Sequence, residues 1–478
     1  MLEFSRKTNL LEQSAYRYTL QDVQEPNLYR HLYDYASIPK VPFNHRMVPM
    51  NTPDQVWITD TTFRDGQQAC SPFTVEQIVR LFQLLHKLGG PNGLIRQSEF
   101  FLYTEKDKQA VRKCQELGYA FPEVTSWIRA NDKDFQLVKD IGLKETGILV
   151  SCSDYHIFKK MNLNRSQAME KYLGIVRSAL AFDIIPRCHF EDITRADFYG
   201  FVVPFANELM KLAEECGRPI KIRACDTLGY AVSYPGAALP RSVPGIIYGL
   251  QHYSGVPSAW LEWHGHNDFY KVVTNAATAW LYGCSGVNCS LLGIGERTGN
   301  CPLEAMSIEY ASLRGTTDGM DLSVITEIAE FFEMDLGYEI PPRTPFVGRY
   351  FNATRAGIHA DGLLKDEEIY NIFDTAAILN RPATVAVDSH SGLAGVAHWL
   401  NSFYSLKDDL AVDKRHPVVQ AMRDAVDQLY REGRNTVMGD GELEEILQTI
   451  DNDFFLFATN YKIRSKKERV IQDQVKQD

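Results

Sequence analysis

From about residue 55 onward, short runs of apolar and β-branched residues alternate with longer stretches in which apolar residues recur three and four positions apart. The short runs predict buried strands and the longer stretches predict amphipathic helices, so the alternation indicates βα units and a parallel sheet. The predicted strands cover residues 56–61, 94–101, 120–126, 145–151, 184–190, 220–225, 261–266 and 287–293. The helical patterns between them cover residues 75–88, 106–117, 165–182 and 206–216. Eight such strands predict an α/β fold, a (β/α)₈ TIM barrel at residues 55–315.

Two further regions flank the predicted barrel. Residues 1–54 are rich in aromatic residues and contain Pro39, Pro42 and Pro49, which predicts an irregular N-terminal extension that packs on the barrel or on a partner subunit. Residues 316–478 carry mainly helical patterns, including one at 322–334 and a Pro-rich turn at 340–345. We expect a helical C-terminal region that ends, at 462–478, in a solvated helix or frayed tail.

The composition narrows the classes of function. The 478 residues are 45% hydrophobic and 23% charged, which is ordinary globular usage. The formal net charge of −11 argues against a surface built for nucleic acid. No apolar run approaches the ~18 residues of a membrane helix, and residues 1–11 carry Glu3, Arg6 and Lys7 instead of an apolar signal segment. We therefore expect no nucleic-acid partner and no membrane partner.

The cysteine pattern indicates the cellular compartment. The nine cysteines include no CxxC pair, and most lie inside apolar segments, as reduced and buried thiols do. A cysteine metal site is the less favoured alternative. The sequence predicts a protein of the reducing cytoplasm.

In a TIM barrel the residues at the carboxyl ends of the strands face the active site. The first predicted strand ends in DTTFRDGQQ at residues 60–68, which places the Arg64 guanidinium beside the Asp65 carboxylate, with Gln68 following. Taken alone, such a neighbouring pair is more often a surface ion pair. The seventh predicted strand carries two histidines that favour a metal site over a surface ion pair.

The seventh predicted strand ends in WHGHND at residues 263–268. Because side chains alternate along a strand, His264 and His266 point to the same face and both imidazoles can reach one ion. The alternative is a pair of hydrogen-bonded histidines. Two imidazoles and the Asp65 carboxylate suit a catalytic divalent metal, for which Mn²⁺, Mg²⁺, Co²⁺ and Zn²⁺ all qualify.

Three further strand ends carry polar residues. In the fifth strand, Arg187, His189 and Glu191 share one parity and are predicted to point into the barrel, where a buried Arg needs a carboxylate from the protein or from a substrate. Thr227 follows the sixth strand, either as a carboxylate ligand or in a structural turn. The GIGERTGN segment at 293–300 is not a clean G-x-G-x-x-G and ends a barrel, so dinucleotide binding is not expected.

Together, DTTFRDGQQ at 60–68, HGHND at 264–268 and GERTGN at 295–300 resemble the metal-dependent acyl-CoA condensing enzymes of the isopropylmalate synthase and homocitrate synthase (DRE-TIM metallolyase) superfamily. The resemblance covers about residues 55–380. It implies that Asp65, His264 and His266 bind a divalent metal, with Mn²⁺ the expected ion. Asn300 stands at the position of a further ligand or close neighbour, and Arg64 would polarise the keto oxygen of the substrate.

The resemblance extends beyond the barrel. RAGIHAD at 355–361 is similar to a segment of these enzymes, and Tyr370 stands eleven residues after His359. The resemblance implies that Glu191, His359 and Tyr370 form the acid/base group. Considered without the family pattern, His359 would be interpreted as a surface histidine.

The same resemblance bears on the substrate. Homocitrate synthases use an Arg at the place of Arg187 to hold the distal carboxylate of a 2-oxo acid, which implies a dicarboxylic substrate, oxaloacetate or 2-oxoglutarate. Thr227, Gln68 and His189 would complete the substrate site. The N-terminal extension and the helical C-terminus, without an obvious regulatory domain, look most similar to the Re-type citrate synthases of this superfamily, which join acetyl-CoA to oxaloacetate.

Several alternatives stay open. Homocitrate synthase or isopropylmalate synthase-type condensation would use the same site with another 2-oxo acid. A metal-dependent C–C lyase or aldolase is disfavoured because the related lyases carry a Cys in the loop that here holds Glu296. A catalytically silent scaffold barrel is disfavoured because the ligand set is intact. The family usually forms dimers, so a homodimer is expected.

Overall fold

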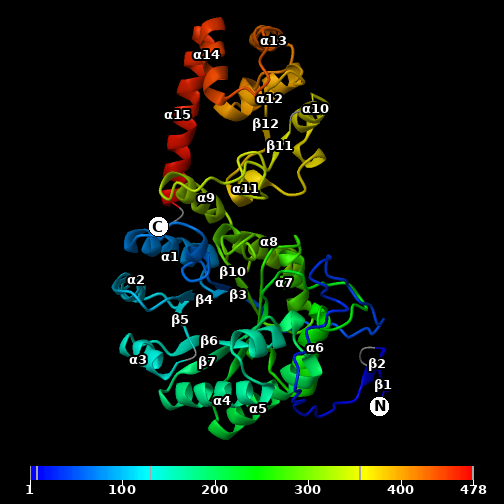
Figure 1. The fold of residues 1–478 in the computed structure, drawn as a ribbon. Helices are drawn as coiled ribbons and strands as arrows, with labels where there is room; N and C mark the ends of the chain where they lie inside the picture. The colour runs from blue at the N-terminus through cyan, green and yellow to red at the C-terminus, as the bar shows by residue number, and fades with distance from the viewer. Residues whose placement is uncertain (1, 7–8, 130, 355–356, 476–478) are drawn as a thin grey trace. The chain divides into compact units, whose positions relative to one another are not determined.

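The computed structural model describes residues 2–6, 9–129, 131–354 and 357–475. The chain forms two compact units, Met1–Val324 and Ile325–Asp478. The first unit holds a closed barrel of eight parallel strands in the order β10-β3-β4-β5-β6-β7-β8-β9, surrounded by helices (Figure 1). The barrel confirms the predicted (β/α)₈ fold.

The strands of the barrel lie close to the predicted runs. Their bounds are β3 (Trp57–Asp60), β4 (Ile95–Phe100), β5 (Glu123–Ile128), β6 (Glu145–Ser151), β7 (Ile185–Glu191), β8 (Lys221–Asp226), β9 (Leu261–Gly265) and β10 (Gly286–Cys289). Two strand boundaries differ from those predicted. β5 begins after Pro122, which has no backbone N–H to donate, and β10 ends at Cys289 because the chain turns through η6 (Leu291–Gly293), where Leu292 has φ 54°.

Four helices around the barrel follow the predicted amphipathic stretches: α1 (Val75–Gly89), α2 (Glu105–Glu116), α4 (Arg165–Ala181) and α5 (Val203–Cys216). The sequence analysis did not name the others, which are α3 (Asp132–Asp140), α6 (Val243–Ser254), α7 (Val272–Leu281) and α8 (Leu303–Arg314). α1 shows how the sequence defines a start: Thr74 and Gln77 form a reciprocal capping box that satisfies backbone N–H groups at its first turn. The side chains of Leu81, Leu85 and Leu88 are almost fully buried beneath it.

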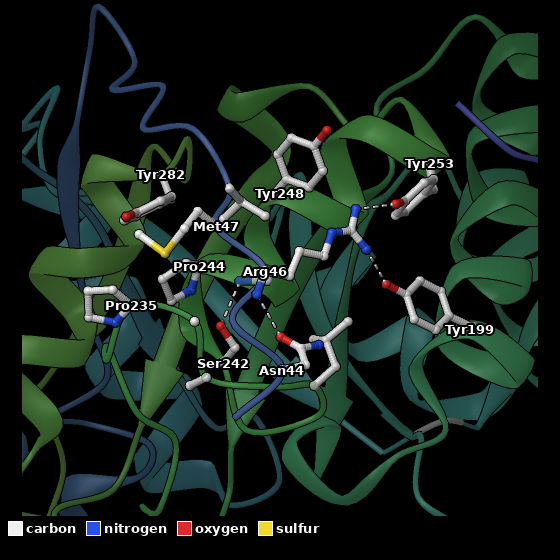
Figure 2. Close-up of a pocket in the computed structure, with 15 residues that line it drawn as sticks. Asn44, Arg46, Met47, Tyr199, Pro235, Ser242, Pro244, Tyr248, Tyr253 and Tyr282 are labelled. Carbon is white, nitrogen blue, oxygen red and sulfur yellow. Dashed lines mark hydrogen bonds between the residues drawn. The ribbon is translucent and has the colours of Figure 1, made fainter. Parts of the chain in front are cut away.

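The N-terminal extension packs on the barrel. It opens with an antiparallel hairpin, β1 (Leu2–Ser5) and β2 (Leu10–Gln13), and continues as irregular chain beside α6 and α7 (Figure 1). Arg46 anchors the end of this segment: its guanidinium donates to the hydroxyls of Tyr199 and Tyr253 at 3.0 and 2.7 Å, beside a pocket that Tyr248 also lines (Figure 2).

The same extension also reaches the loops at the carboxyl ends of β7 and β8. The buried Tyr33 donates its hydroxyl to the carbonyl of Thr194 at 3.0 Å, and Tyr230 donates to the same carbonyl at 3.1 Å. The Arg241 guanidinium donates to the carbonyls of Pro39 and Lys40. The extension is thus hydrogen-bonded to the segments that lie next to the candidate site.

The second unit is mainly helical, as predicted. It contains α9 (Val324–Met334), α10 (Gly357–Lys365), α11 (Thr375–Leu379), α12 (Leu393–Tyr404), α13 (Pro417–Arg431), α14 (Asp440–Ile450) and α15 (Asn452–Val475), with a short parallel pair β11 (Ala353–Thr354) and β12 (Thr384–Val385). Its core forms where Leu400, Val419, Met422 and Leu447 pack together.

Neither unit offers a membrane segment or a disulfide in the described ranges. None of the helices there combines the length and the apolar character that a membrane span requires. All nine cysteines are free thiols, and seven of them are buried. Burial raises the pKa of the Cys188 thiol to about 12, so this thiol stays protonated at neutral pH.

Glu304, at the start of α8, gives a testable pH dependence. Burial raises the pKa of this carboxyl to about 7, although the backbone N–H of Leu292 donates to it at 3.1 Å. Folding therefore favours the protonated form, and wild-type stability should decline as the pH rises from the ordinary carboxyl range to about 7. Glu304→Gln, which keeps an acceptor oxygen, should raise stability by about 1–3 kcal/mol at pH 8.

Thermal unfolding of wild type and Glu304→Gln at pH 5 and pH 8 measures this effect. At pH 5 the two proteins should have nearly equal midpoints, because the wild-type carboxyl is then protonated in the folded state. An equal gain at both pH values would contradict the assignment.

Candidate active site

The carboxyl ends of β3 and β9 bring together a carboxylate and two imidazoles. Asp65, His264 and His266 are all buried, and one ligand atom from each lies within 4.8 Å of the others. Asp65 Oδ2 is 3.8 Å from His264 Nε2 and 3.9 Å from His266 Nε2, and the two Nε2 atoms are 3.3 Å apart. Donor atoms about 2.1 Å from a shared ion stand about 3.0–3.4 Å apart, so a small contraction completes a metal site.

The hydrogen bonds of the site leave the correct atoms free for a metal. The Asn288 amide donates its Nδ2–H to Thr59 Oγ1, so its Oδ1 accepts from His264 Nδ1 at 2.8 Å. His264 therefore carries its proton on Nδ1 and turns the Nε2 lone pair toward Asp65. Asp65 Oδ1 accepts from Arg64, whereas Oδ2 is buried and has no hydrogen-bond partner among the described residues.

The electrostatics match this assignment. Burial, together with the nearby His266, lowers the pKa of His264 to about 3, and burial also lowers the pKa of His266 against the opposing effect of Asp65. Both rings are therefore neutral, the form that binds metals. Burial alone would raise the pKa of Asp65, but the Arg64 guanidinium and both histidines hold it well below its usual range. An ionised carboxylate and two neutral imidazoles fit a divalent cation.

Asn300 lies next to this group. Its backbone forms a bridge with that of His266, and its buried side-chain Oδ1 has no hydrogen-bond partner in the described part of the chain. The loop that carries it turns tightly: Gly299 has φ 91°, and a Cβ there would stand 2.1 Å from the carbonyl oxygen of Gly293. A glycine is therefore required where the loop brings Asn300 to the site.

Arg64 is held in a fixed place at the mouth of the barrel. Its guanidinium donates to Asp65 at 2.9 Å and to Glu99 at 3.0 Å, and it lies over the Trp127 ring at 5.1 Å. Gln68, four residues later in η1 (Gly66–Ala69), is exposed. The structure brings Arg64 to the candidate metal centre and leaves Gln68 open to solvent at the same end of the barrel.

Arg187 and His189 point into the barrel, as their parity predicted. Arg187 is 2% exposed and ion-pairs with Glu145, with Glu99 and Glu262 at 3.5 and 3.6 Å. Of the two alternatives left open by the sequence, a protein carboxylate thus meets this guanidinium. Arg187 Nη1 is the atom that lies 3.5 Å from Glu99 Oε1, and it has no hydrogen-bond partner among the described residues. His189 Nε2 lies 3.5 Å from Glu99.

Glu99, at the centre of this interior network, was not predicted from the sequence. Glu99 on β4 contacts Arg64, Arg187 and Arg223, and the positive charge of these three guanidiniums lowers its pKa although burial opposes this. With Asp65 included, the network contains four cations and four anions. The cations are Arg64, Arg187, Lys221 and Arg223, and the anions are Asp65, Glu99, Glu145 and Glu262. Charged residues at alternate positions of an apolar strand were the available signal.

Glu191 and Thr227 lie at the ends of β7 and β8. Glu191 accepts from Ser151 Oγ, and its Oε2 is 3.1 Å from Nδ1 of His156, a residue that the sequence analysis did not single out. Thr227 Oγ1 accepts from the backbone N–H of Asp192 at 2.8 Å. The two neighbouring loops are thus hydrogen-bonded to one another at the mouth.

His359 and Tyr370 belong to the second unit, and the first two residues of the predicted RAGIHAD segment lie outside the described residues. His359 is exposed on α10, and its ring centroid is 4.6 Å from that of Tyr370, which is 46% exposed. The structure therefore brings these two predicted acid/base residues together within their own unit.

A closed parallel barrel with two imidazoles and one carboxylate at the carboxyl ends of its strands defines a class, the metal-dependent TIM-barrel enzymes. The comparison with family models gives the particular family. The model described as HMGL-like matches residues 55–332, and the chain belongs to this family.

Three relatives resemble the chain over nearly its whole length. A protein of Clostridium kluyveri named Citrate (Re)-synthase is 58% identical over 92% of this chain and 97% of its own. A protein of Syntrophus aciditrophicus with the same name is 55% identical over 92% of this chain and 70% of its own. A 2-phosphinomethylmalate synthase of Streptomyces hygroscopicus is 36% identical over 90% of this chain and 98% of its own.

Proposed function

We propose that this chain is an acyltransferase that condenses acetyl-CoA with oxaloacetate, giving citrate and CoA with Re-face selectivity. The observation that carries the proposal is the 58% identity to the Clostridium kluyveri Citrate (Re)-synthase across 97% of that protein. The buried group of Asp65, His264 and His266 supplies the site that such a metal-dependent reaction needs. The 2-phosphinomethylmalate synthase relative supports the wider assignment to synthases.

Asp65, His264 and His266 would hold the divalent cation, with Asn300 as a further ligand or close neighbour. When bound, the cation supplies Lewis-acid polarisation of the keto group of the 2-oxo acid. Arg64 aims its guanidinium at the same place and would stabilise the negative charge that develops on the keto oxygen. Its fixed contacts with Asp65 and Glu99 reduce the reorganisation needed during the reaction.

Thr227, Gln68, His189 and Arg187 would bind the substrate. A dicarboxylic 2-oxo acid brings two negative charges, and the balanced interior network gains two positive charges when a divalent cation is bound. The substrate would therefore restore neutrality in a site that excludes water. Arg187 Nη1, which has no hydrogen-bond partner among the described residues, is the donor proposed for its distal carboxylate.

Glu191, His359 and Tyr370 would handle the protons. A base takes a methyl proton from acetyl-CoA, and the resulting carbon nucleophile attacks the keto carbon. The new alkoxide then takes up a proton, and water hydrolyses the thioester to release CoA. His359 is the proposed base, with Tyr370 beside its ring.

Four finer points complete the proposal. Mn²⁺ is the proposed metal, because carboxylate and imidazole ligands suit it. We also propose a homodimer, in line with the family resemblance, and a cytoplasmic location, in line with nine free thiols. Citrate formation would give the enzyme a place in the tricarboxylic acid cycle.

A substrate panel tests the proposal. Purified protein with Mn²⁺ and acetyl-CoA should release free CoA with oxaloacetate, and at least about 100-fold more slowly with 2-oxoglutarate, 2-oxoisovalerate or pyruvate, as a buried charged site discriminates. A thiol-reactive dye measures the release. Activity with 2-oxoisovalerate alone would reject the dicarboxylate site, and cleavage of a hydroxyacyl-CoA without condensation would favour a lyase.

A further inference from the structure

His156 is the imidazole that contacts Glu191 within the first unit. It lies in η2 (Tyr155–Lys160), the π-helical turn that follows β6, whereas Glu191 ends the neighbouring strand β7. His156 Nδ1 is 3.1 Å from Glu191 Oε2, and both side chains are largely buried, at 17% and 16% exposure. The pair therefore belongs to the mouth of the barrel, next to the proposed condensation site.

The contacts of the Glu191 carboxylate with Ser151, His156 and Lys160 all involve one oxygen, Oε2. In the described ranges, Ser151 Oγ donates to Oε2, His156 Nδ1 faces Oε2, and Lys160 Nζ is 3.7 Å from Oε2. The other oxygen, Oε1, has none of these contacts. A carboxylate fixed through one oxygen presents the other in a defined direction, as an acceptor for a reacting proton or for the group that carries it.

A second carboxylate holds the far side of the imidazole. His156 Nε2 is 3.7 Å from Asp192 Oδ2, and this oxygen accepts from Ser153 Oγ at 2.5 Å and from Arg195 at 2.8 Å. Asp192 adopts φ 61°, a left-handed conformation that costs a non-glycine residue energy. With this backbone conformation, the consecutive carboxylates of Glu191 and Asp192 lie near the two ring nitrogens of His156.

The N-terminal extension supports the segment that carries His156. The neighbouring Tyr155 donates its hydroxyl to the carbonyl of Leu28 at 2.8 Å, and the Arg195 guanidinium stacks over the Tyr155 ring at 3.9 Å. Asp154 accepts from the backbone N–H of Asn27 at 2.7 Å. These contacts restrict η2, so the direction of the His156 ring is determined by packing as well as by its two carboxylate neighbours.

We propose that His156 is a positioning residue of the condensation: it holds Glu191 through Oε2 and leaves Oε1 as the acceptor for the proton-transfer step. This inference rests on the proposed function, and it adds a residue outside the predicted acid/base group. Glu191 then acts as a permanent acceptor that orients the proton carrier, and the base itself is another residue.

The charges around Glu191 agree with this role. Burial alone would raise its pKa, but His156, Ser151 and Lys160 together lower it to about 2. The other titratable groups that face it are Cys152, Tyr172 and Cys225 on the adjoining strands and helix, and the carboxylate of Asp192 beside His156. Removing His156 takes away the largest of the lowering contributions, so the pKa of Glu191 should move up toward its usual range.

Three variants of the metal-loaded full-length protein test the inference. His156→Ala should lower kcat by about 100-fold while the KM for oxaloacetate changes by less than about 3-fold. His156→Asn, whose Nδ2–H can donate to Glu191 from the place of Nδ1, should recover most of the loss. Lys159→Ala, an exposed neighbour on the same turn, is the matched control and should behave as wild type.

An unchanged kcat in His156→Ala would overturn the inference and leave the proposed function standing. A failure of His156→Asn to recover activity would overturn the hydrogen-bonding role. Should the wild type itself make no citrate, the proposed function fails, and the pairing is then judged without turnover. In a double-mutant cycle of His156→Ala and Glu191→Gln, urea unfolding midpoints should shift by less than the sum of the single shifts, whereas strict additivity would reject the pairing.

Discussion

Replacing His264 by alanine should abolish metal-dependent turnover, with kcat reduced by at least about 1,000-fold. The physical reason is geometric. His264 offers one of the three buried candidate ligand atoms, and Asn288 fixes its tautomer so that Nε2 faces Asp65. Two remaining ligands cannot hold a divalent cation against water at micromolar concentrations, so titration calorimetry with Mn²⁺ should detect no binding.

His390→Ala is the matched control, because its side chain is 84% exposed in the second unit. It should bind Mn²⁺ and turn over as wild type does. The circular dichroism of His264→Ala should also match that of wild type, since the truncated side chain leaves the strand β9 intact. Full activity in His264→Ala, or unchanged Mn²⁺ binding, would refute the metal centre.

Arg187→Ala should destabilise the protein by about 3–5 kcal/mol, the typical result of removing one partner from a buried ion pair. The Arg187 guanidinium pairs with Glu145 and lies near Glu99 and Glu262, all inside the barrel. Without the guanidinium, these buried carboxylates lose the positive charge that compensates them, and water has little room to solvate them instead. The thermal unfolding midpoint should fall by several degrees at least.

The substrate role of Arg187 is separable from this structural role. At a temperature where the variant is folded, the KM for oxaloacetate should rise severely if Nη1 binds the distal carboxylate. A folded variant with an unchanged KM would reject that contact and leave only the interior network. Arg177→Ala, on the exposed face of α4, is the control and should change neither quantity. An unchanged midpoint in Arg187→Ala would contradict the network.

The barrel could be predicted because each βα unit carries its own local signal. β6 and β7 match the predicted runs to within a residue, because Ile148 and Val150 in β6 and Cys188 and Phe190 in β7 mark buried strand positions. The helix α3 was missed because it has nine residues and a polar sequence. The end of β10 was misjudged because Leu291 and Leu292 extend the apolar run into a turn.

The grouping of Asp65, His264 and His266 could be predicted because the spacing of the two histidines along one strand fixes their common face. Glu99, Arg223 and His156 could not, because each acquires its role from a partner on another strand or loop. The local sequence marks Glu99 as a charged residue within a buried strand, but it does not show the three guanidiniums that Glu99 contacts. The contacts of Tyr33 and Arg46 with the barrel are likewise tertiary, and no periodic pattern marks them.

The most direct test of the account is mass spectrometry of the product formed from [¹³C₂]acetyl-CoA and unlabelled oxaloacetate, with Mn²⁺ present or removed by a chelator. The account predicts citrate heavier by two mass units, formed in equal amount to free CoA and only when the metal is present. Unlabelled citrate, labelled citrate formed equally well without metal, or CoA release without citrate would contradict it.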